Sequence, residues 1–332
     1  MSRESPNASE ELSNLIVAGD RVALGRAITL IESAKPEDQA RAQQLLERLL
    51  PRTGKAIRVG ISGVPGAGKS TLIDQIGLNL VAKGNKVAVL AVDPTSTRSG
   101  GSILGDKTRM GRLAAEEGAF IRPSPAGDSP GGVTKTTRET IALVEAAGYE
   151  VVLVETVGVG QSETAVFNMV DVFVVVGIPG AGDELQGIKR GLLELADVIA
   201  VNKADSDQVE RANSAAMEYR AALHILAAGN PNWSPVVLTV SARDNIGLDE
   251  LWTKVKERHA ALKASGALHA RRSEQAVAWM REIFEQRLLA AFKGGKEVGR
   301  RWSEMEKKVR SGEMTPTAAA QKLGRLAGIE EG

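Results

Sequence analysis

Hydrophobic positions in the middle of the chain form short, uninterrupted runs rich in Val and Ile, rather than an alternating pattern. Continuous apolar runs are typical of strands that are buried on both faces of a parallel sheet. Helix-like stretches, such as 71–82 and 134–147, lie between most of these runs. We therefore predict an α/β fold with a doubly wound, mostly parallel sheet and a ligand site at the carboxyl ends of its strands. The predicted strands are Ile57–Ser62, Lys86–Val92, Ala119–Arg122, Val151–Glu155, Val172–Ile178, Asp197–Asn202 and Pro235–Val240.

The two ends of the chain follow a helical pattern instead. Apolar residues recur at steps of three and four from 12 to 49 and again from 277 to 326, and no strand is predicted after the α/β region. We expect an N-terminal helical extension (1–54), an α/β domain (55–265) and a C-terminal helical arm (266–332). An apolar stripe on an isolated helical arm needs a second surface to cover it, so the arm favours a homodimer.

The charge composition of the chain limits the kinds of molecule that it is expected to bind. The 332-residue chain has 42 Lys and Arg against 41 Asp and Glu, which gives a formal net charge of +1. This balance argues against nucleic acid and against a membrane surface, both of which attract strongly basic proteins. The polar N-terminus has no apolar signal segment and no apolar run is long enough to span a bilayer, so we expect a cytoplasmic protein.

Cysteine is absent, and the three histidines, His224, His259 and His269, are scattered along the chain. Disulfides, thiolate nucleophiles and Cys-based metal sites are therefore excluded. A lone His on a helix is more often an ordinary surface or core residue than a metal ligand. Glycine is abundant, with 35 residues, about a tenth of the chain against an average of about 7%. This excess indicates loops in which backbone groups bind a ligand.

The strongest functional signal is a glycine-rich segment between a predicted strand and a predicted helix. It matches the phosphate-binding pattern G-x-x-x-x-G-K-[ST], which requires that context. Glycines allow backbone N–H groups to surround a phosphate, and the N-terminus of the following helix adds a favourable dipole. We expect Lys69 to neutralise the β- and γ-phosphates and the Ser70 hydroxyl to ligate Mg²⁺. The predicted nucleotide-binding residues here are Gly63, Val64, Pro65, Gly66, Ala67, Gly68, Lys69, Ser70 and Thr71.

Two acidic residues lie where predicted strands end. Asp93 directly follows one strand and Glu155 ends another, so both carboxylates are expected near Ser70, able to hold Mg²⁺ directly or through water. The segment 155–158 resembles the D-x-x-G switch signature with Glu in place of Asp, and the Gly158 N–H is expected to sense the γ-phosphate. We predict Lys69, Asp93, Glu155 and Gly158 as catalytic residues. The predicted metal ligands are Ser70, Asp93 and Glu155.

A second motif indicates which base is bound. The segment Asn202-Lys203-Ala204-Asp205 follows a predicted strand and matches N-K-x-D, the guanine-recognition motif of GTPases. Asp205 is expected to accept hydrogen bonds from guanine N1 and the 2-amino group, and adenine offers neither donor. We expect the Lys203 stem along the purine and Asn202 as a brace of the loop. Ser241-Ala242-Arg243 resembles the element whose backbone N–H contacts guanine O6. The motifs therefore predict GTP as substrate and GDP as product.

Beyond these motifs, segments 92–110, 121–134 and 155–163 resemble the ArgK/MeaB group of P-loop GTPases, which act as chaperones for metallocofactor insertion. The resemblance covers nearly the whole chain and departs from it at 127–130, where relatives usually read Arg-Gly-Thr-Leu. It implies a homodimeric, Mg²⁺-dependent GTPase that binds the B12-dependent methylmalonyl-CoA mutase, gates adenosylcobalamin loading and protects the mutase from inactivation. The lack of Cys and of His clusters disfavours delivery of a bare metal ion and agrees with an organometallic client cofactor.

The predicted site lacks a side chain suited to orient the attacking water. In GTPases of the Ras class a Gln close behind the D-x-x-G glycine does so. Here Val159 follows that glycine and the nearest glutamine is Gln161. We therefore predict slow intrinsic hydrolysis that a partner protein accelerates.

Two glycine-containing segments, 93–112 and 177–189, are candidate switches through which a partner acts on the phosphates. Replacing Lys189 by Ala is expected to reduce partner-stimulated hydrolysis while GTP affinity is retained. The candidate switch residues are Asp106, Arg109, Asp183, Gln186 and Lys189.

Two other functions stay open on the sequence. A P-loop with Mg²⁺ can pass phosphate to a small molecule or a protein, which would make the chain a kinase, although the guanine motif argues against this. A scaffold that binds its client without catalysis is the other alternative. A labelled acceptor after incubation with labelled GTP would indicate a kinase, and single-turnover hydrolysis with and without mutase tests the scaffold.

Overall fold

The computed structural model describes most of the chain. The described residues are 7–92, 110–123, 130–156, 162–179, 190–205, 208–226, 234–294 and 296–326. The chain divides into two compact units, residues 1–269 and 270–332. Among the described helices, none combines the length and the apolar composition that a bilayer span requires.

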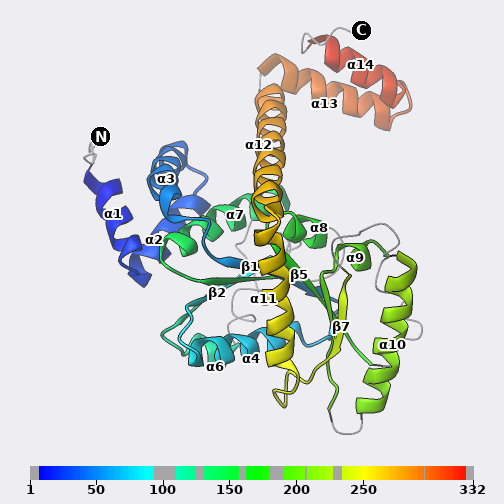
Figure 1. Ribbon diagram of the computed structural model, residues 1–332. Helices are drawn as coiled ribbons and strands as arrows, with labels where there is room; N and C mark the ends of the chain where they lie inside the picture. Colours follow the sequence, from blue (N-terminus) through cyan, green and yellow to red (C-terminus); the bar gives the residue numbers. More distant parts are fainter. Residues whose placement is uncertain are drawn as a thin grey trace. The chain divides into compact units, whose positions relative to one another are not determined.

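The first unit is built around a sheet of seven parallel strands in the order β3-β2-β4-β1-β5-β6-β7 (Figure 1). Each strand predicted from an apolar run is present, and its bounds lie within one residue of those expected. The prediction of a doubly wound parallel sheet is therefore confirmed. The strands are β1 (Ile57–Gly63), β2 (Val87–Val92), β3 (Ala119–Arg122), β4 (Val151–Thr156), β5 (Val172–Gly177), β6 (Val198–Val201) and β7 (Val236–Thr239).

The strands are continuously apolar because helices cover both faces of the sheet. Every residue of β2, β4, β5 and β6 is buried. In the middle of β1, a Cβ on Gly60 would lie 2.7 Å from the Phe173 ring and 3.0 Å from Val166, so the missing side chain lets these neighbours pack closely. Close packing on this face helps to hold the central strand, whose carboxyl end leads into the glycine-rich loop.

Helices α4 and α6 cover one face of the sheet, and α7 and α8 cover the other (Figure 1). From β1 the chain builds outward to β2 and β3, and after β4 it builds toward β5, β6 and β7 on the other side of β1. The direction thus reverses at β1, and ligands of open α/β sheets bind at such a switch point. The helices of this unit are α1 (Asn7–Val17), α2 (Arg21–Glu32), α3 (Pro36–Leu49), α4 (Lys69–Ala82), α6 (Gly111–Ala114), α7 (Pro130–Ala146), α8 (Ser162–Phe167), α9 (Arg190–Leu195), α10 (Val209–Leu226) and α11 (Leu248–Ala264).

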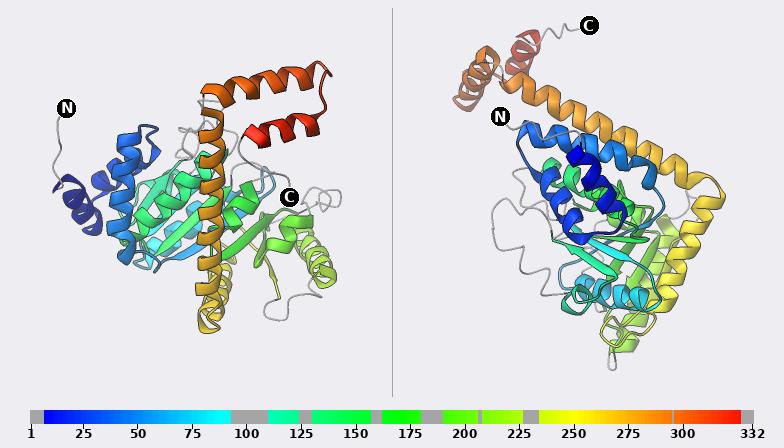
Figure 2. Two further views of the ribbon diagram at one scale, coloured as in Figure 1. Left: turned by 90° about the horizontal axis from the view of Figure 1, so that it is seen from above. Right: turned by 90° about the vertical axis from the view of Figure 1, so that its left-hand side faces the viewer.

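The three N-terminal helices lie together beside α7 and pack against it (Figure 2). Ile16, Leu24 and Leu45 are buried and belong to the same hydrophobic core as the sheet. Asp20 caps α2, because its Oδ1 accepts a hydrogen bond from the Ala23 N–H at 2.8 Å. The N-terminal helices are therefore a part of the first unit's core and not a separate body.

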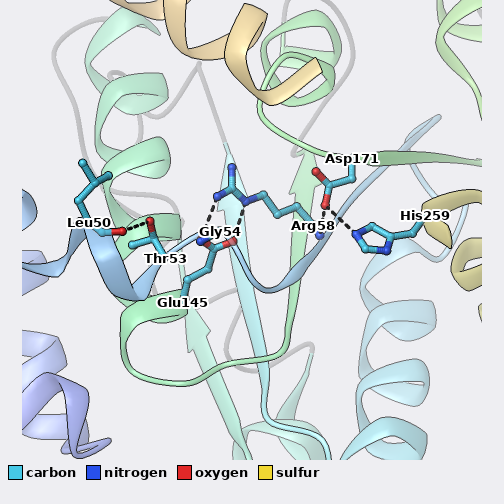
Figure 3. Close-up of polar contacts among 7 residues, drawn as sticks. All are labelled: Leu50, Thr53, Gly54, Arg58, Glu145, Asp171 and His259. Carbon is cyan, nitrogen blue, oxygen red and sulfur yellow. Dashed lines mark hydrogen bonds and ion pairs between the residues drawn. The ribbon is translucent and has the colours of Figure 1, made fainter. Parts of the chain in front are cut away.

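A polar network secures the amino end of β1, opposite the end that leads into the glycine-rich loop (Figure 3). The Arg58 guanidinium donates to both oxygens of Glu145 at 2.7 and 2.9 Å, and Glu145 also accepts from the Gly54 N–H at 2.6 Å. Asp171 accepts from the Arg58 N–H at 2.9 Å, and its Oδ2 lies 3.8 Å from His259 Nε2 on α11. The network joins β1, α7, α11 and the start of β5, and so holds these elements in place relative to one another.

The second unit consists of helices only. It contains α12 (Ala267–Gly294) from residue 270 onward, α13 (Lys296–Arg310) and α14 (Pro316–Leu326). Thr315 caps α14 by accepting a hydrogen bond from the Ala318 N–H at 3.3 Å, with Pro316 in the first turn. The Phe292 and Trp302 rings meet edge to face, with centroids 6.3 Å apart, so α12 and α13 share an aromatic contact.

Candidate functional site

The glycine-rich loop leaves the carboxyl end of β1 and enters α4 at Lys69. Gly63, Gly66 and Gly68 have φ values of +149°, +78° and +83°, which side-chain-bearing residues rarely adopt. A Cβ on Gly63 would lie 2.2 Å from the Val176 carbonyl oxygen of β5. The loop therefore needs glycine at these positions both for its backbone conformation and for its close approach to the neighbouring strand.

Lys69 is the first residue of α4, and its side chain turns back over the loop. Its ammonium group donates to the Gly63 carbonyl at 2.8 Å and to the Val64 carbonyl at 3.3 Å. The residue is only 9% exposed. The loop thus holds a buried cation beside backbone groups at the N-terminus of α4, where an anion is favoured.

Ser70 and Glu155 meet at the edge of the sheet. The Ser70 hydroxyl donates to Glu155 Oε1 at 2.9 Å, and Glu155 is buried in β4. The register explains the contact, since Glu155 pairs with Ile61 of β1 and with Ala91 of β2. Both are hard oxygen donors, of the kind that Mg²⁺ binds. No group of three or more His, Asp or Glu able to hold a metal occurs in the described ranges, so Mg²⁺ here would also need oxygens from a nucleotide or water.

Several predicted site residues lie outside the described residues. Asp93 is one of them, although β2, which precedes it, pairs with β4 up to Val92 and Thr156. These residues are Asp93, Asp106, Arg109, Gly158, Val159, Gln161, Asp183, Gln186 and Lys189, together with most of the divergent segment 127–130.

Asn202 follows β6 and lies between the two sequence motifs. Its side-chain N–H donates to the Ala67 carbonyl of the glycine-rich loop at 2.8 Å, and its Oδ1 accepts from the Ala242 N–H at 3.0 Å. The Asn202 backbone N–H donates to the Gly177 carbonyl of β5 at 2.9 Å. A Cβ on Gly68 would lie 2.6 Å from the Asn202 amide nitrogen. One buried amide therefore joins the glycine-rich loop to the loop after β7.

Asp205 lies at the same edge, and its side chain is 16% exposed. Its Oδ1 accepts a short hydrogen bond from the Ser241 hydroxyl, and its Oδ2 lies 3.5 Å from Arg243 Nη1. Lys203 turns the chain with a φ of +65°, and the Ala204 N–H donates to the Val240 carbonyl at 3.0 Å. The structure thus brings the segments 202–205 and 241–243 together around one carboxylate, beside the loop that ends at Lys69.

One buried acidic residue of α4 was not predicted from the sequence. Asp74, one turn after Ser70 in α4, is buried and accepts from Arg112 Nε at 2.8 Å and from the Leu113 N–H at 3.0 Å. Gly77 lies one turn further on, where a Cβ would be 2.3 Å from Leu113. Helix α6 is therefore attached tightly to α4. An Asp on the buried face of a helix was the available signal, but its partner 38 residues away could not be inferred.

Comparison with known proteins gives consistent matches. The family model described as "Methylmalonyl Co-A mutase-associated GTPase MeaB" matches residues 24–297. A putative GTPase of Caulobacter vibrioides is 54% identical over 320 residues, which are 96% of this chain and 98% of that protein. The mouse mitochondrial methylmalonic aciduria type A homolog is 45% identical over 318 residues, 93% of this chain and 77% of that protein. A crystal structure described as a LAO/AO transport system kinase has a TM-score of 0.79 at 38% identity, and covers 98% of this chain and all of that one.

Proposed function

The chain belongs to the MeaB family of methylmalonyl-CoA mutase-associated GTPases, and from this premise we propose that it couples GTP hydrolysis to adenosylcobalamin loading of a methylmalonyl-CoA mutase and protects that mutase. GTPase activity is the activity of the family. The observation that carries the proposal is the buried Asn202 amide, which joins the glycine-rich loop to the loop around Asp205. A single nucleotide can therefore place its phosphates on one loop and its base on the other.

The phosphates would bind at the loop 63–71. Backbone N–H groups at the start of α4 donate to phosphate oxygens, and the Lys69 ammonium exchanges its two carbonyl contacts for the β- and γ-phosphates. Mg²⁺, when bound with the nucleotide, neutralises charge on the phosphate oxygens. Ser70 and Glu155 would hold that ion directly or through water, which supports the assignment of both residues as metal ligands.

The base would be read by Asp205. Guanine presents two adjacent N–H donors to the carboxylate, whereas adenine presents none, and a site that hydrogen-bonds a group rejects the analogue lacking it by about 10⁴-fold or more. Ala242 follows β7, and its backbone N–H donates to Asn202 Oδ1 at 3.0 Å, which keeps the loop after β7 beside the segment 202–205. The acceptor oxygens of Asp205 therefore support binding of GTP rather than ATP.

Exchanging the base-reading carboxylate tests this assignment. Asp205→Asn offers an N–H donor in place of an acceptor, so GTP binding is expected to fall strongly while xanthosine triphosphate, with a carbonyl at C2, binds better. Asp249→Asn is the matched control, because Asp249 is 77% exposed on α11 and pairs only with a surface lysine among its described contacts. Retention of GTP selectivity by Asp205→Asn would overturn the assignment.

Hydrolysis requires water to attack the γ-phosphorus. A bond forms from the water oxygen to phosphorus while the bond to the β–γ bridging oxygen breaks, and GDP, phosphate and a proton leave. In the sequence Val159 directly follows Gly158, and an apolar side chain cannot orient that water. We expect slow turnover alone, well below the ~1–100 per second of typical kinases, and faster turnover with the mutase. Labelled phosphate recovered on an acceptor molecule would instead identify a kinase.

The partner is tested with purified proteins. GTP hydrolysis and transfer of adenosylcobalamin to apo-mutase are measured with and without the chain and with the Lys69→Ala variant, which removes the phosphate-binding cation. We expect co-elution with the mutase, stimulated hydrolysis, and cofactor loading that depends on Lys69. Absence of both co-elution and stimulation would reject the mutase as client. Co-elution with the mutase without any GTP hydrolysis in a single-turnover experiment would instead identify a non-catalytic scaffold.

We place the homodimer contact on the second unit. Helix α12 exposes apolar side chains at helical spacing, including Met280, Phe284 and Leu288, which are 61%, 65% and 59% exposed. The same unit has an apolar cavity of about 920 Å³ between α12, α13 and α14, lined by residues such as Trp302 and Leu323. Isolated apolar stripes of this kind mark interaction surfaces.

Light scattering over a range of protein concentrations tests the homodimer. Met280→Glu is expected to shift the protein from dimer to monomer, because it places a charge in the apolar stripe. Met217→Glu on α10 is the matched control, since Met217 is 66% exposed on the first unit and outside the stripe. Equal behaviour of the two variants would contradict this location of the contact.

A further inference from the structure

The Arg243 guanidinium lies between two carboxylates. It donates from Nε to Asp244 Oδ1 at 2.9 Å and from its Nη2 atom to Asp244 Oδ2 at 3.1 Å. Its remaining terminal nitrogen, Nη1, lies 3.5 Å from Asp205 Oδ2. The Arg243 side chain is 64% exposed, whereas that of Asp205 is 16% exposed. An exposed cation is therefore aimed at the carboxylate that the proposed function assigns to guanine.

The carboxylate of Asp205 has a limited number of acceptor positions. Two carboxylate oxygens offer about four lone-pair directions. The Ser241 hydroxyl already donates to Oδ1, and Arg243 approaches Oδ2. Guanine needs one acceptor on each oxygen for its N1–H and 2-amino groups. On Oδ2 the guanidinium and one N–H group of the base would share the two lone-pair directions, so the bulky guanidinium restricts how the base can approach that oxygen.

We propose that Arg243 competes with guanine for Asp205 and thereby slows association of guanine nucleotides, with Asp244 as the acceptor that holds the guanidinium when Asp205 turns to the base. This inference rests on the proposed function. The shorter contacts to Asp244 support it, because they keep the guanidinium in place after the longer contact to Asp205 breaks. The hydrogen bonds from Arg243 also hold the pKa of the exposed Asp244 carboxyl below its usual value, so this acceptor stays charged near neutral pH.

The size of the effect follows from the exposure of the pair. Exposed ion pairs contribute little, and their loss changes an equilibrium by about two- to fivefold. Since Asp205 is largely buried, we expect the upper part of that range. Removing a cation would by itself slow the approach of an anionic nucleotide, so faster association after removal of Arg243 is a result that simple charge attraction does not produce.

Stopped-flow fluorescence with N-methylanthraniloyl-GDP measures the association and dissociation rate constants. Salt near 0.15 M limits long-range steering, because the Debye length is then about 8 Å. Arg243→Gln is expected to raise the association rate constant about two- to fivefold and to change dissociation less. Asp244→Asn is expected to lower it, because the substitution removes the charged acceptor to which Arg243 donates two hydrogen bonds and leaves its ion pair with Asp205 in place.

Arg48→Gln is the matched control, since Arg48 is 46% exposed and its guanidinium lies 3.7 Å from Glu10 in the N-terminal helices. Its rate constants should equal those of the wild type. An association rate constant that is unchanged or lower in Arg243→Gln would overturn the competition. If it falls and dissociation speeds up, Arg243 holds the base instead. Failure of the wild type to bind the labelled nucleotide would overturn the proposed function itself, which separates the two outcomes.

Discussion

Replacing Asn202 by Ala tests whether one amide holds the nucleotide site together. The side chain is buried, with the residue 2% exposed, and it makes one donated and one accepted hydrogen bond. Its partners, the Ala67 carbonyl and the Ala242 N–H, belong to residues that are 0% and 1% exposed. The substitution therefore leaves a buried acceptor and a buried donor, one in each loop, without the group that bridges them.

The magnitude follows from those two groups. Each buried polar group left without a partner costs about 1–3 kcal/mol. The sum is about 2–6 kcal/mol, and because losses above about 4 kcal/mol from a single substitution are exceptional, we expect a loss of about 2–4 kcal/mol. For a unit of this size, 1 kcal/mol shifts the midpoint of thermal unfolding by about 2 °C, so the midpoint should fall by about 4–8 °C. GTP affinity should fall about tenfold or more, because the phosphate and base loops lose their shared contact.

Urea unfolding and thermal unfolding followed by circular dichroism measure the loss, and equilibrium binding measures the affinity. Asn168→Ala is the matched control, since Asn168 is exposed just after α8 in the same unit. Its free energy of unfolding should stay within about 0.5 kcal/mol of the wild type. If the free energy of unfolding of Asn202→Ala changes equally little, Asn202 does not brace the two loops. If in that case GTP binding is weakened, Asn202 contacts the nucleotide directly.

Three further substitutions test the packing and the charges of the first unit by urea unfolding. Gly77→Ala should lose about 1–3 kcal/mol, because its Cβ would lie 2.3 Å from Leu113, and trimming Leu113 to Ala in the same chain should recover part of this loss. Glu145→Gln should lose about 1–3 kcal/mol, less than a fully buried pair, because the Arg58 side chain is 19% exposed, and a loss below about 0.5 kcal/mol would contradict this. Burial raises the pKa of Tyr149 above its usual 10, so the stability from its neutral form is full below that pH and is lost as pH rises through the folded pKa. As the pH rises from about 9 to about 11, the free energy of unfolding of Tyr149→Phe should therefore fall less than that of the wild type.

The strands could be predicted from the sequence because each signal is local. A strand buried on both faces must be apolar at every position, so Val172–Ile178 and Val151–Glu155 stand out within a few residues of chain. The loop 63–68 could also be predicted from its glycines, because a positive φ or a close approach of two backbones allows few other residue types. The helical ends could be predicted from the period of their apolar residues, but the individual residues that they contact could not.

Contacts between residues that are far apart in the chain could not be predicted from the sequence. Arg112 approaches Asp74 only because α6 packs on α4 at Gly77, and nothing in the spacing of these residues fixes that approach. The same is true of Arg243, which was predicted for its backbone in the element after β7. The structure shows its side chain turned toward Asp205, because the turn at Asn245 brings the Ser241 and Ile246 backbones together in an antiparallel bridge. Side-chain direction in a loop depends on such a turn, which local composition does not encode.

The polar groups at the carboxyl edge of the sheet are already engaged with protein partners. Lys69 contacts two loop carbonyls, Ser70 donates to Glu155, and Asp205 accepts from Ser241 beside Arg243. Nucleotide binding would therefore exchange hydrogen bonds, and its free energy is the difference between new and existing contacts. Such an exchange lowers affinity for any ligand but preserves selectivity, because adenine would displace the contacts of Asp205 and return none. Affinity therefore depends on the contacts that the protein gives up, whereas selectivity depends on the hydrogen bonds that Asp205 can form with the base.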